Sequence, residues 1–548
     1  MRAKLSHSGR GVLVVAFFAM VLAASAQTQT NGPNVGVAKG FRVAGEYFDP
    51  PNEQQMKSLI EGAEGRPLGN NVFQLTQLKL TTFQTNGQAE MIVLAPDCLF
   101  DNASGIASSP GPLTVQTADG QFNLQGNGFH WLQNVSVLYI SNDVHSVLHK
   151  LTANDTNAPE AASPGGGDID VFSDHFTRDL KTGISAYNDN VRVTGTNVNL
   201  GADNMSLYLP LTNGLITLLG NATWASGQRN GGADRLELDR DNNLMRAYTN
   251  AFLKMPGTAI GTNSTGTAST NKLVEVLSDQ YELRTNWTEF HGDVRVTQYD
   301  SNQPTGKMTC EAMTAAIAGG NAIESVVAET NVVVEQQDGR FTSDVAKFYA
   351  TNSTAVFTGN ATWLKGTRSG AGDTLFVDQT RGEMTVFSNA MMKLPGSAFD
   401  QSTNAISTNK ITTITSDDYL VKAGHAEFHG HAHIIDPKMN VTSELLTAES
   451  LPGQTNIERV IADKNVVADL TDSSGKLTHV TSQHALYTLS DQLLRLTGTP
   501  IVQNDQGWLT GSIIVWDRNY DLLIARNQRM IFQGTNSTAS MPDPFSSK

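Results

Sequence analysis

An internal repeat constrains the fold of this chain more than any other feature of its sequence. A short phrase centred on Gly-Asn occurs at residues 219–224, 358–363 and, more weakly, 497–502, and its glycines lie at equal intervals of 139 residues. Aspartates farther along the copies, at positions 239, 378 and 517, keep the same interval. Because the register holds without a gap, the sequence predicts copies of one structural unit joined in tandem.

The copies also share a starting phrase of the form Ser-Asp-x-aromatic, at residues 173, 278 and 416. The first copy is about 34 residues shorter between this phrase and the repeat glycine. A stretch rich in Pro, Gly and Ala before the first copy predicts a linker. The predicted organisation is a signal peptide at 1–26, a flexible lead-in at 27–40, a separate N-terminal β domain at 41–150, a linker at 151–170, a shortened repeat at 171–257, two full repeats at 276–396 and 414–534, and a polar tail at 535–548.

Alternation of apolar and polar residues, as in residues 73–80, predicts half-buried strands through most of the chain. Charged residues are only 17% of the sequence, against about 25% in an average soluble domain. The residues that replace them, mainly Thr, Asn, Ser and Gly, suit strands and turns, so the predicted fold class is all-β. One exception is residues 52–61, where Met56, Leu59 and Ile60 have helical spacing and predict a short helix.

Successive side chains of a strand point to opposite faces, so residues two apart share a face. Leu236, Leu375 and Ile514 occupy the same place in the three copies, and each has an apolar partner two residues later. Each copy therefore offers one apolar face, and we expect these faces to pack into a continuous apolar interior.

The first 26 residues have the parts of an export signal: basic residues, an apolar run at 11–23 and the small-residue site Ala24-Ser25-Ala26. An uncleaved leader would instead anchor the chain in a membrane. The chain from Gln27 onward has 35 Lys and Arg against 53 Asp and Glu, a balance of −18, which excludes binding of nucleic acid through a basic face. Cys98 and Cys310 match neither metal-ligand nor redox spacing and are interpreted as structural thiols, although export would permit a disulfide.

The repeated phrases at 292–296, 330–334 and 359–363, each followed by a strand and a turn, resemble a known family. Their cadence is similar to the "G-N-V-x-V … L-x-Y-D" rhythm of the OstA-like proteins, the LptA and LptC components of lipopolysaccharide transport. The resemblance covers about residues 171 to 534, and residues 41–150 resemble LptC-type domains more loosely through 95–98 and 141–144.

The resemblance implies open, V-shaped β-jellyroll units stacked end to end in the periplasm. It also implies that the apolar interior holds the acyl chains of lipopolysaccharide or a related glycolipid during transfer to the outer membrane, and that exposed edge strands bind other transport components. No cofactor and no enzyme activity are expected. The candidate groove residues are Val294, Val296, Val332, Val334, Trp363, Leu375 and Val377 in the second repeat and Ile514 and Trp516 in the third.

Alternative functions stay open at this point. On a strand, His429, His431 and His433 would project from one face and could bind a metal, but the matching segment of the second repeat has Asp and Arg at the last two places. An extracytoplasmic scaffold or adhesin would use the same strands with a filled interior. A carbohydrate-active β-solenoid enzyme would require carboxylates gathered at one surface site.

Overall fold

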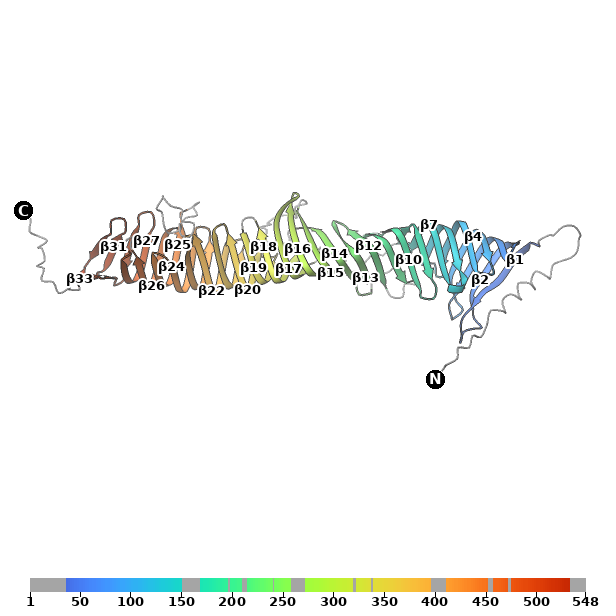
Figure 1. The fold of residues 1–548 in the computed structure, drawn as a ribbon, viewed down its shortest axis with the longest axis horizontal. Helices are drawn as coiled ribbons and strands as arrows, with labels where there is room; N and C mark the ends of the chain where they lie inside the picture. Colours follow the sequence, from blue (N-terminus) through green and yellow to red (C-terminus); the bar gives the residue numbers. More distant parts are fainter. Residues whose placement is uncertain are drawn as a thin grey trace, which may run out of the picture. The chain divides into compact units, whose positions relative to one another are not determined.

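The computed structural model describes residues 36–149, 168–195, 198–208, 214–239, 241–257, 272–318, 322–336, 339–395, 411–451, 457–471 and 475–532 (Figure 1). In these residues the regular structure is β-strand, apart from one 3-10 turn at Gln133–Val135. The described part contains no helix long and apolar enough to cross a membrane. The chain forms two compact units, Met1–Leu253 with Gln280–Thr285 and Lys254–Asp279 with Asn286–Lys548. The predicted all-β fold is confirmed.

The first unit is an antiparallel meander in which each strand pairs with the next along the chain, apart from two short strands, Ile169–Ser173 and His175–Asp179, that follow each other and both pair with Val137–Leu148 and Ile184–Thr194. Its strands are β1 (Ala38–Tyr47), β2 (Met56–Gly69), β3 (Val72–Phe83), β4 (Ala89–Asp101), β5 (Ile106–Thr117), β6 (Phe122–Leu132), β7 (Val137–Leu148), β8 (Ile169–Ser173), β9 (His175–Asp179), β10 (Ile184–Thr194), β11 (Asn199–Tyr208), β12 (Leu215–Ser226) and β13 (Arg229–Asp239). β14 (Leu244–Pro256) and β15 (Lys272–Leu283) contribute residues to both units.

The second unit continues the same pattern, and its two full repeats share one sheet because β22 pairs with β23. Its strands are β16 (Trp287–Asp300), β17 (Gln303–Ala318), β18 (Ala322–Gln336), β19 (Gly339–Tyr349), β20 (Thr354–Lys365), β21 (Arg368–Asp378), β22 (Glu383–Pro395), β23 (Ile411–Lys422), β24 (His425–Asp436), β25 (Met439–Ser450), β26 (Ile457–Thr471), β27 (Leu477–Thr488), β28 (Leu493–Thr497), β29 (Ile501–Asn504), β30 (Gly507–Thr510), β31 (Ile513–Asp517), β32 (Leu522–Arg526) and β33 (Arg529–Phe532).

Each long strand of the repeats bends near its midpoint, where the ladder with its neighbour is interrupted. In β20 the bend is formed by Gly359 and Asn360, which have φ values of 76° and 50°. The pairing with β19 skips from Thr358 to Thr362 at this point. The Asn360 side chain donates a hydrogen bond of 3.0 Å to Oδ2 of Asp344 on the neighbouring strand. The repeat phrase found in the sequence is therefore the corner of a bent strand.

Glycine is required at this corner for two reasons. A φ of 76° lies in the left-handed region that side chains disfavour, and a Cβ at Gly359 would lie 2.4 Å from Oδ2 of Asp344. Gly220 in β12 has the same geometry, with φ of 75° and a Cβ position 2.3 Å from Oδ2 of Asp203. The 139-residue interval thus marks equivalent corners in successive copies.

In β18 the corner, formed by Thr330 and Asn331, preserves the side-chain alternation on either side of it. In β18, Val326 and Ala328 before the corner and Val332 and Val334 after it are all buried, at 3%, 0%, 1% and 6% exposure. A two-residue corner keeps the same parity of inward positions in such a strand, whereas the partner strand β19 skips the single residue Asp344 and its buried positions shift from Ser343 to Ala346. The two halves of each strand then face each other across the interior, which is the predicted β-jellyroll type of fold.

A hydrogen bond between two aromatic side chains crosses the interior in two of the copies. Trp224 Nε1 donates to the Tyr281 hydroxyl at 2.7 Å, and Trp363 Nε1 donates to the Tyr419 hydroxyl at 2.8 Å. Burial raises the pKa of both tyrosines. Gly370 lies beneath the second pair, and a Cβ there would be 2.3 Å from each of the two bonded atoms.

The helix predicted at residues 52–61 is wrong. β2 begins at Met56 and pairs with β1 on one side and β3 on the other. Ser58, Leu59 and Ile60 are consecutive and all buried, so both faces of the strand are covered here. Pairing with two neighbours outweighs a helical spacing carried by only three apolar residues.

Strands on the two sides of the predicted linker pair with each other: β7 pairs with β8 and β9, for example Val147 with Asp170. The boundary between the two compact units lies instead near residue 253. The domain boundaries derived from the sequence stay predictions. Residues 151–167 of the linker, the whole leader, residues 27–35 of the lead-in, and the tail lie outside the described residues.

Both cysteines are unpaired and buried, Cys98 in β4 and Cys310 in β17. Burial raises the pKa of the Cys98 thiol to about 12 and that of the Cys310 thiol to about 11. Cys310 lies opposite Val294 in the ladder of β16 and β17. Its reactivity therefore reports whether water reaches the interior beside that candidate residue.

The aromatic pair predicts that alanine substitution destabilises the protein at Gly370 but not at Gly306. Gly370→Ala should lower the free energy of unfolding by about 2–3 kcal/mol, because the new Cβ must displace the Trp363–Tyr419 hydrogen bond. Gly306→Ala is the control, since its Cβ would meet no atom closer than 3.6 Å; we expect a change within about 1 kcal/mol. Urea unfolding followed by tryptophan fluorescence measures both, and equal midpoints for the two variants would contradict the proposed crowding.

The thiols give a second prediction. A thiol with a raised pKa is almost entirely protonated at about pH 8 and is a poor nucleophile. Iodoacetamide should leave Cys98 and Cys310 unmodified in the native protein and modify both after denaturation in guanidinium, as read by mass spectrometry. Native modification of Cys310 at the rate of an exposed thiol would show instead that solvent enters the interior beside Val294.

Candidate functional site

The predicted groove residues come from five strands of the second unit. Val294 and Val296 lie on β16, Val332 and Val334 on β18, Trp363 on β20, Leu375 and Val377 on β21, and Ile514 and Trp516 on β31. Eight of the nine are buried, with exposures between 0% and 6%, and Val377 is half-buried. Their neighbours Val333 and Phe376, predicted for the opposite face, are half-buried.

Two of the nine border an opening into the interior of the second repeat. Val296 and Val334 lie on either side of Met308 in the ladders of β16, β17 and β18. Together with Gln298 and Gly306 they border a space of about 250 Å³. The other seven line none of the three cavities described here.

Deeper in the second repeat, the interior is filled by three phenylalanines that the sequence did not single out. The Phe341 and Phe357 rings stack with centroids 5.1 Å apart, and the Phe348 ring meets Phe357 edge-on at 5.8 Å. Phe357 lies opposite Leu375 in the ladder of β20 and β21. This part of the interior is packed rather than hollow.

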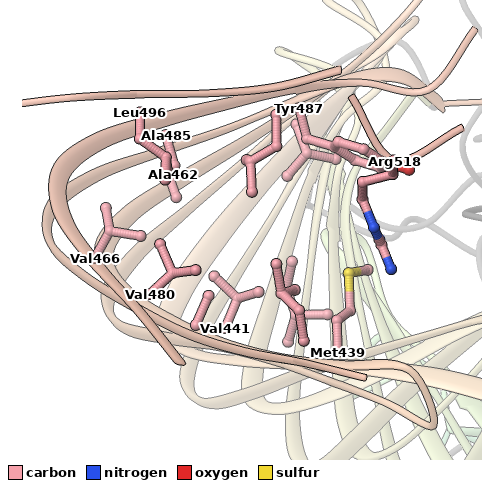
Figure 2. Close-up of a pocket in the computed structure, with 14 residues that line it drawn as sticks. Met439, Val441, Ala462, Val466, Val480, Ala485, Tyr487, Leu496 and Arg518 are labelled. Atoms are coloured by element: carbon pink, nitrogen blue, oxygen red, sulfur yellow. The ribbon is translucent and has the colours of Figure 1, made fainter. Parts of the chain in front are cut away.

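The third repeat contains an apolar cavity of about 560 Å³ that opens to solvent (Figure 2). It lies between the halves of β26, since Val460 and Ala462 before the corner and Val466 and Ala468 after it all line the space. The remaining lining residues are Ile434, Met439, Val441, Leu470, Val480, Ala485, Tyr487, Leu494, Leu496 and Arg518. None of these was among the groove residues predicted from the sequence, although they share the inward face of the same alternating strands.

Arg518 supplies the charge of this cavity. Its guanidinium lies 5.9 Å from the ring centroids of both Tyr487 and Trp516, within the range of cation–π attraction. Figure 2 shows the side chain beside Tyr487, with the guanidinium directed toward the side of Met439. The backbone of Arg518 is held by a 3.1 Å hydrogen bond from its N–H to the carbonyl of Gln492.

The first unit has a larger and more polar cavity, of about 1100 Å³, bordered by β4, β6 and β9. Arg178 lies in its wall and forms an ion pair of 3.1 Å with Glu90. Both groups are largely buried; burial raises the pKa of Glu90 and lowers that of Arg178, and their mutual attraction opposes both shifts. A buried ion pair of this kind is typical of a structural role, because removing one partner leaves an unpaired buried charge and destabilises the fold.

The three histidines of the weak metal candidate are held separately. His429 Nδ1 is 2.8 Å from Asp418 Oδ1, His431 Nδ1 is 3.1 Å from Asp417 Oδ2, and His433 Nε2 contacts Asn440. His431 is part of a corner, with φ of 46°, so the three do not follow plain strand alternation. In the residues that the structure describes, no group of three or more His, Cys, Asp or Glu could hold a metal ion.

Similarity to known proteins covers only part of the chain. Comparison with curated proteins finds no significant relative. A solved structure that matches is LptH, the LptA homologous periplasmic component of the lipopolysaccharide transport device from Pseudomonas aeruginosa, at 18% identity over 24% of this chain and 90% of that chain. The TM-score of that match is 0.20, which supports no conclusion about the present chain.

The family comparison falls on the two full repeats. Residues 274–419 and 410–521 each match the family described as "LptA/(LptD N-terminal domain) LPS transport protein". This is a family of transport proteins rather than of enzymes. The resemblance of residues 41–150 to LptC-type domains stays a prediction. The full repeats are therefore similar, broadly, to the OstA-like proteins, through the family that unites LptA with the N-terminal domain of LptD.

Proposed function

We propose that the protein is a periplasmic lipopolysaccharide-transport protein that holds acyl chains in its apolar interior during transfer to the outer membrane. The observation that carries this proposal is an apolar cavity of about 560 Å³ inside a repeat that matches a lipopolysaccharide-transport family. Burying an acyl chain contributes about 0.8 kcal/mol per methylene, so an aliphatic wall can hold lipid without a fixed polar site.

The location and partners are part of the same proposal. An export signal cleaved after Ala26 would deliver the chain to the periplasm, and no cofactor or catalytic step is needed for transfer. The edge formed by β32 and β33 supports contact with another transport component, since Leu522, Ile524 and Met530 are 52%, 56% and 51% exposed there. Exposed edge strands pair readily with strands of another chain.

The packed phenylalanines of the second repeat favour a second candidate, a β-repeat scaffold whose strands serve only as structure. In that case the interior would admit no lipid. The two candidates differ in what adjacent residues of one strand contact, because only the inward positions would meet an acyl chain.

Photo-crosslinking in living cells separates them. A photo-reactive residue at Val332, Val334 or Leu375 of the second repeat, or at the cavity-lining Ala468 of the third, should capture lipopolysaccharide. One at the opposite-face positions Val333, Phe376 or Val467 should capture several-fold less. Immunoblotting of the crosslinked product measures the yield, and protease resistance checks that each variant is folded. Equal capture at both sets, or none at either in folded protein, would contradict lipid binding and favour the scaffold.

A further inference from the structure

The second and third repeats can be compared residue by residue through their ladders. Val334 pairs with Phe341 across β18 and β19, and Ala468 pairs with Val480 across β26 and β27. The next strands correspond in the same way, with Ala346 opposite Phe357 and Ala485 opposite Leu496. The same scaffold therefore carries different side chains at matched inward positions.

These differences change the volume of the interior. Phe341 and Phe357 of the second repeat are replaced by Val480 and Leu496 in the third, and Val334 is replaced by Ala468. The second repeat fills the space with stacked rings, whereas the third leaves the cavity of about 560 Å³. This space is narrow and continuous with solvent, and thirteen of its fourteen lining residues are uncharged and mostly aliphatic, so it suits a single alkyl chain rather than a bulky ligand.

The matched position at the mouth also differs in charge. Arg518 N–H bonds to the Gln492 carbonyl and Gln379 N–H to the Ser353 carbonyl, each at 3.1 Å, which fixes the two residues as equivalents. At this matched position the third repeat thus has a cation where the second repeat has a neutral amide; Lys307, the cation that borders the opening of the second repeat, lies at a different place. Arg518 forms no ion pair with a carboxylate of the described chain. The contacts with Tyr487 and Trp516 are cation–π contacts, and within the described residues the guanidinium donates no hydrogen bond, so its N–H donors stay available.

We propose that this cavity is a site for one alkyl chain of an anionic amphiphile, whose phosphate or carboxylate is held by Arg518 at the mouth. The aliphatic wall supplies affinity for the chain, and the guanidinium supplies preference for a negative head group through charge-assisted hydrogen bonds. The inference rests on the proposed function in assigning lipid to the interior, and it adds the position of a discrete site and the charge of its ligand.

Three soluble probes of the same chain length test the head-group assignment: dodecyl phosphate, laurate and dodecanol, titrated into the full-length protein by calorimetry. Arg518→Gln gives this position the residue of the second repeat. It should weaken binding of dodecyl phosphate and laurate by about tenfold and leave dodecanol unchanged within twofold. The probe that binds the wild type more tightly identifies a phosphate-bearing lipid or a fatty acid as the source. An identical affinity of variant and wild type for all three probes would overturn the role of Arg518.

A second variant tests the cavity by filling it with the side chains of the second repeat. Val480→Phe combined with Leu496→Phe should abolish binding of all three probes, while the fold tolerates rings at these positions as it does in the second repeat. The control is Val467→Phe, which adds a ring on the opposite face of β26 at a residue that is 37% exposed. Circular dichroism and thermal unfolding verify each fold. Undiminished binding by the folded double variant would overturn the site.

Failure of this inference is distinguishable from failure of the proposed function. Capture of lipopolysaccharide at Val334 in cells, together with probe affinities that are unchanged in both variants, would support the transport function and reject the discrete site. Probe binding that responds to both variants, without any capture of lipopolysaccharide, would establish the site and reject the transport role.

Discussion

The left-handed two-residue corner in the middle of alternate long strands is the constraint on which the rest of the structure depends. Gly359 and Asn360 adopt left-handed backbone conformations, and Asp344 on the next strand accepts the hydrogen bond from the Asn360 side chain. The same pairing recurs with Asn221 and Asp203, at 3.1 Å, and with Asn389 and Asp373, at 3.0 Å. Without these bends the strands would form a flat sheet with one exposed apolar face, a surface prone to aggregation.

The residues that determine the fold, at the corners, are different from the inward residues that determine the volume of the interior. Where the corner spans two left-handed residues, as in β18 and β20, inward positions keep their parity across it, and the polar corner atoms stay at the surface. Inward side chains can then vary in size from copy to copy without altering the ladder. Phe341 and Val480 occupy matched places in intact ladders, and one contributes to a ring stack whereas the other lines a cavity.

One arginine in each unit lies at a cavity, and the two arginines differ in whether a carboxylate pairs with them. In the first unit Arg178 and Glu90 are buried together, and their attraction offsets part of the cost of removing both from water. In the second unit Arg518 remains half-exposed over aromatic rings, where a cation keeps access to water and to a ligand. A paired buried cation is suited to holding strands together, and an unpaired cation at an opening is suited to binding an anion.

The sequence by itself determined the all-β class, the tandem repeats and the inward face. Strand alternation and an exact interval depend only on local spacing, so Leu236, Leu375 and Ile514 could be assigned to the interior, and each is 0% exposed. The spacing of Met56, Leu59 and Ile60 was misleading because two neighbouring strands, absent from any local window, cover both faces of β2. Only the tertiary structure decided where the interior is filled and where it is hollow. That difference depends on the summed volume of side chains from several strands, such as Ala468, Val480 and Leu496, which meet only after each strand has bent at its corner and paired with the next.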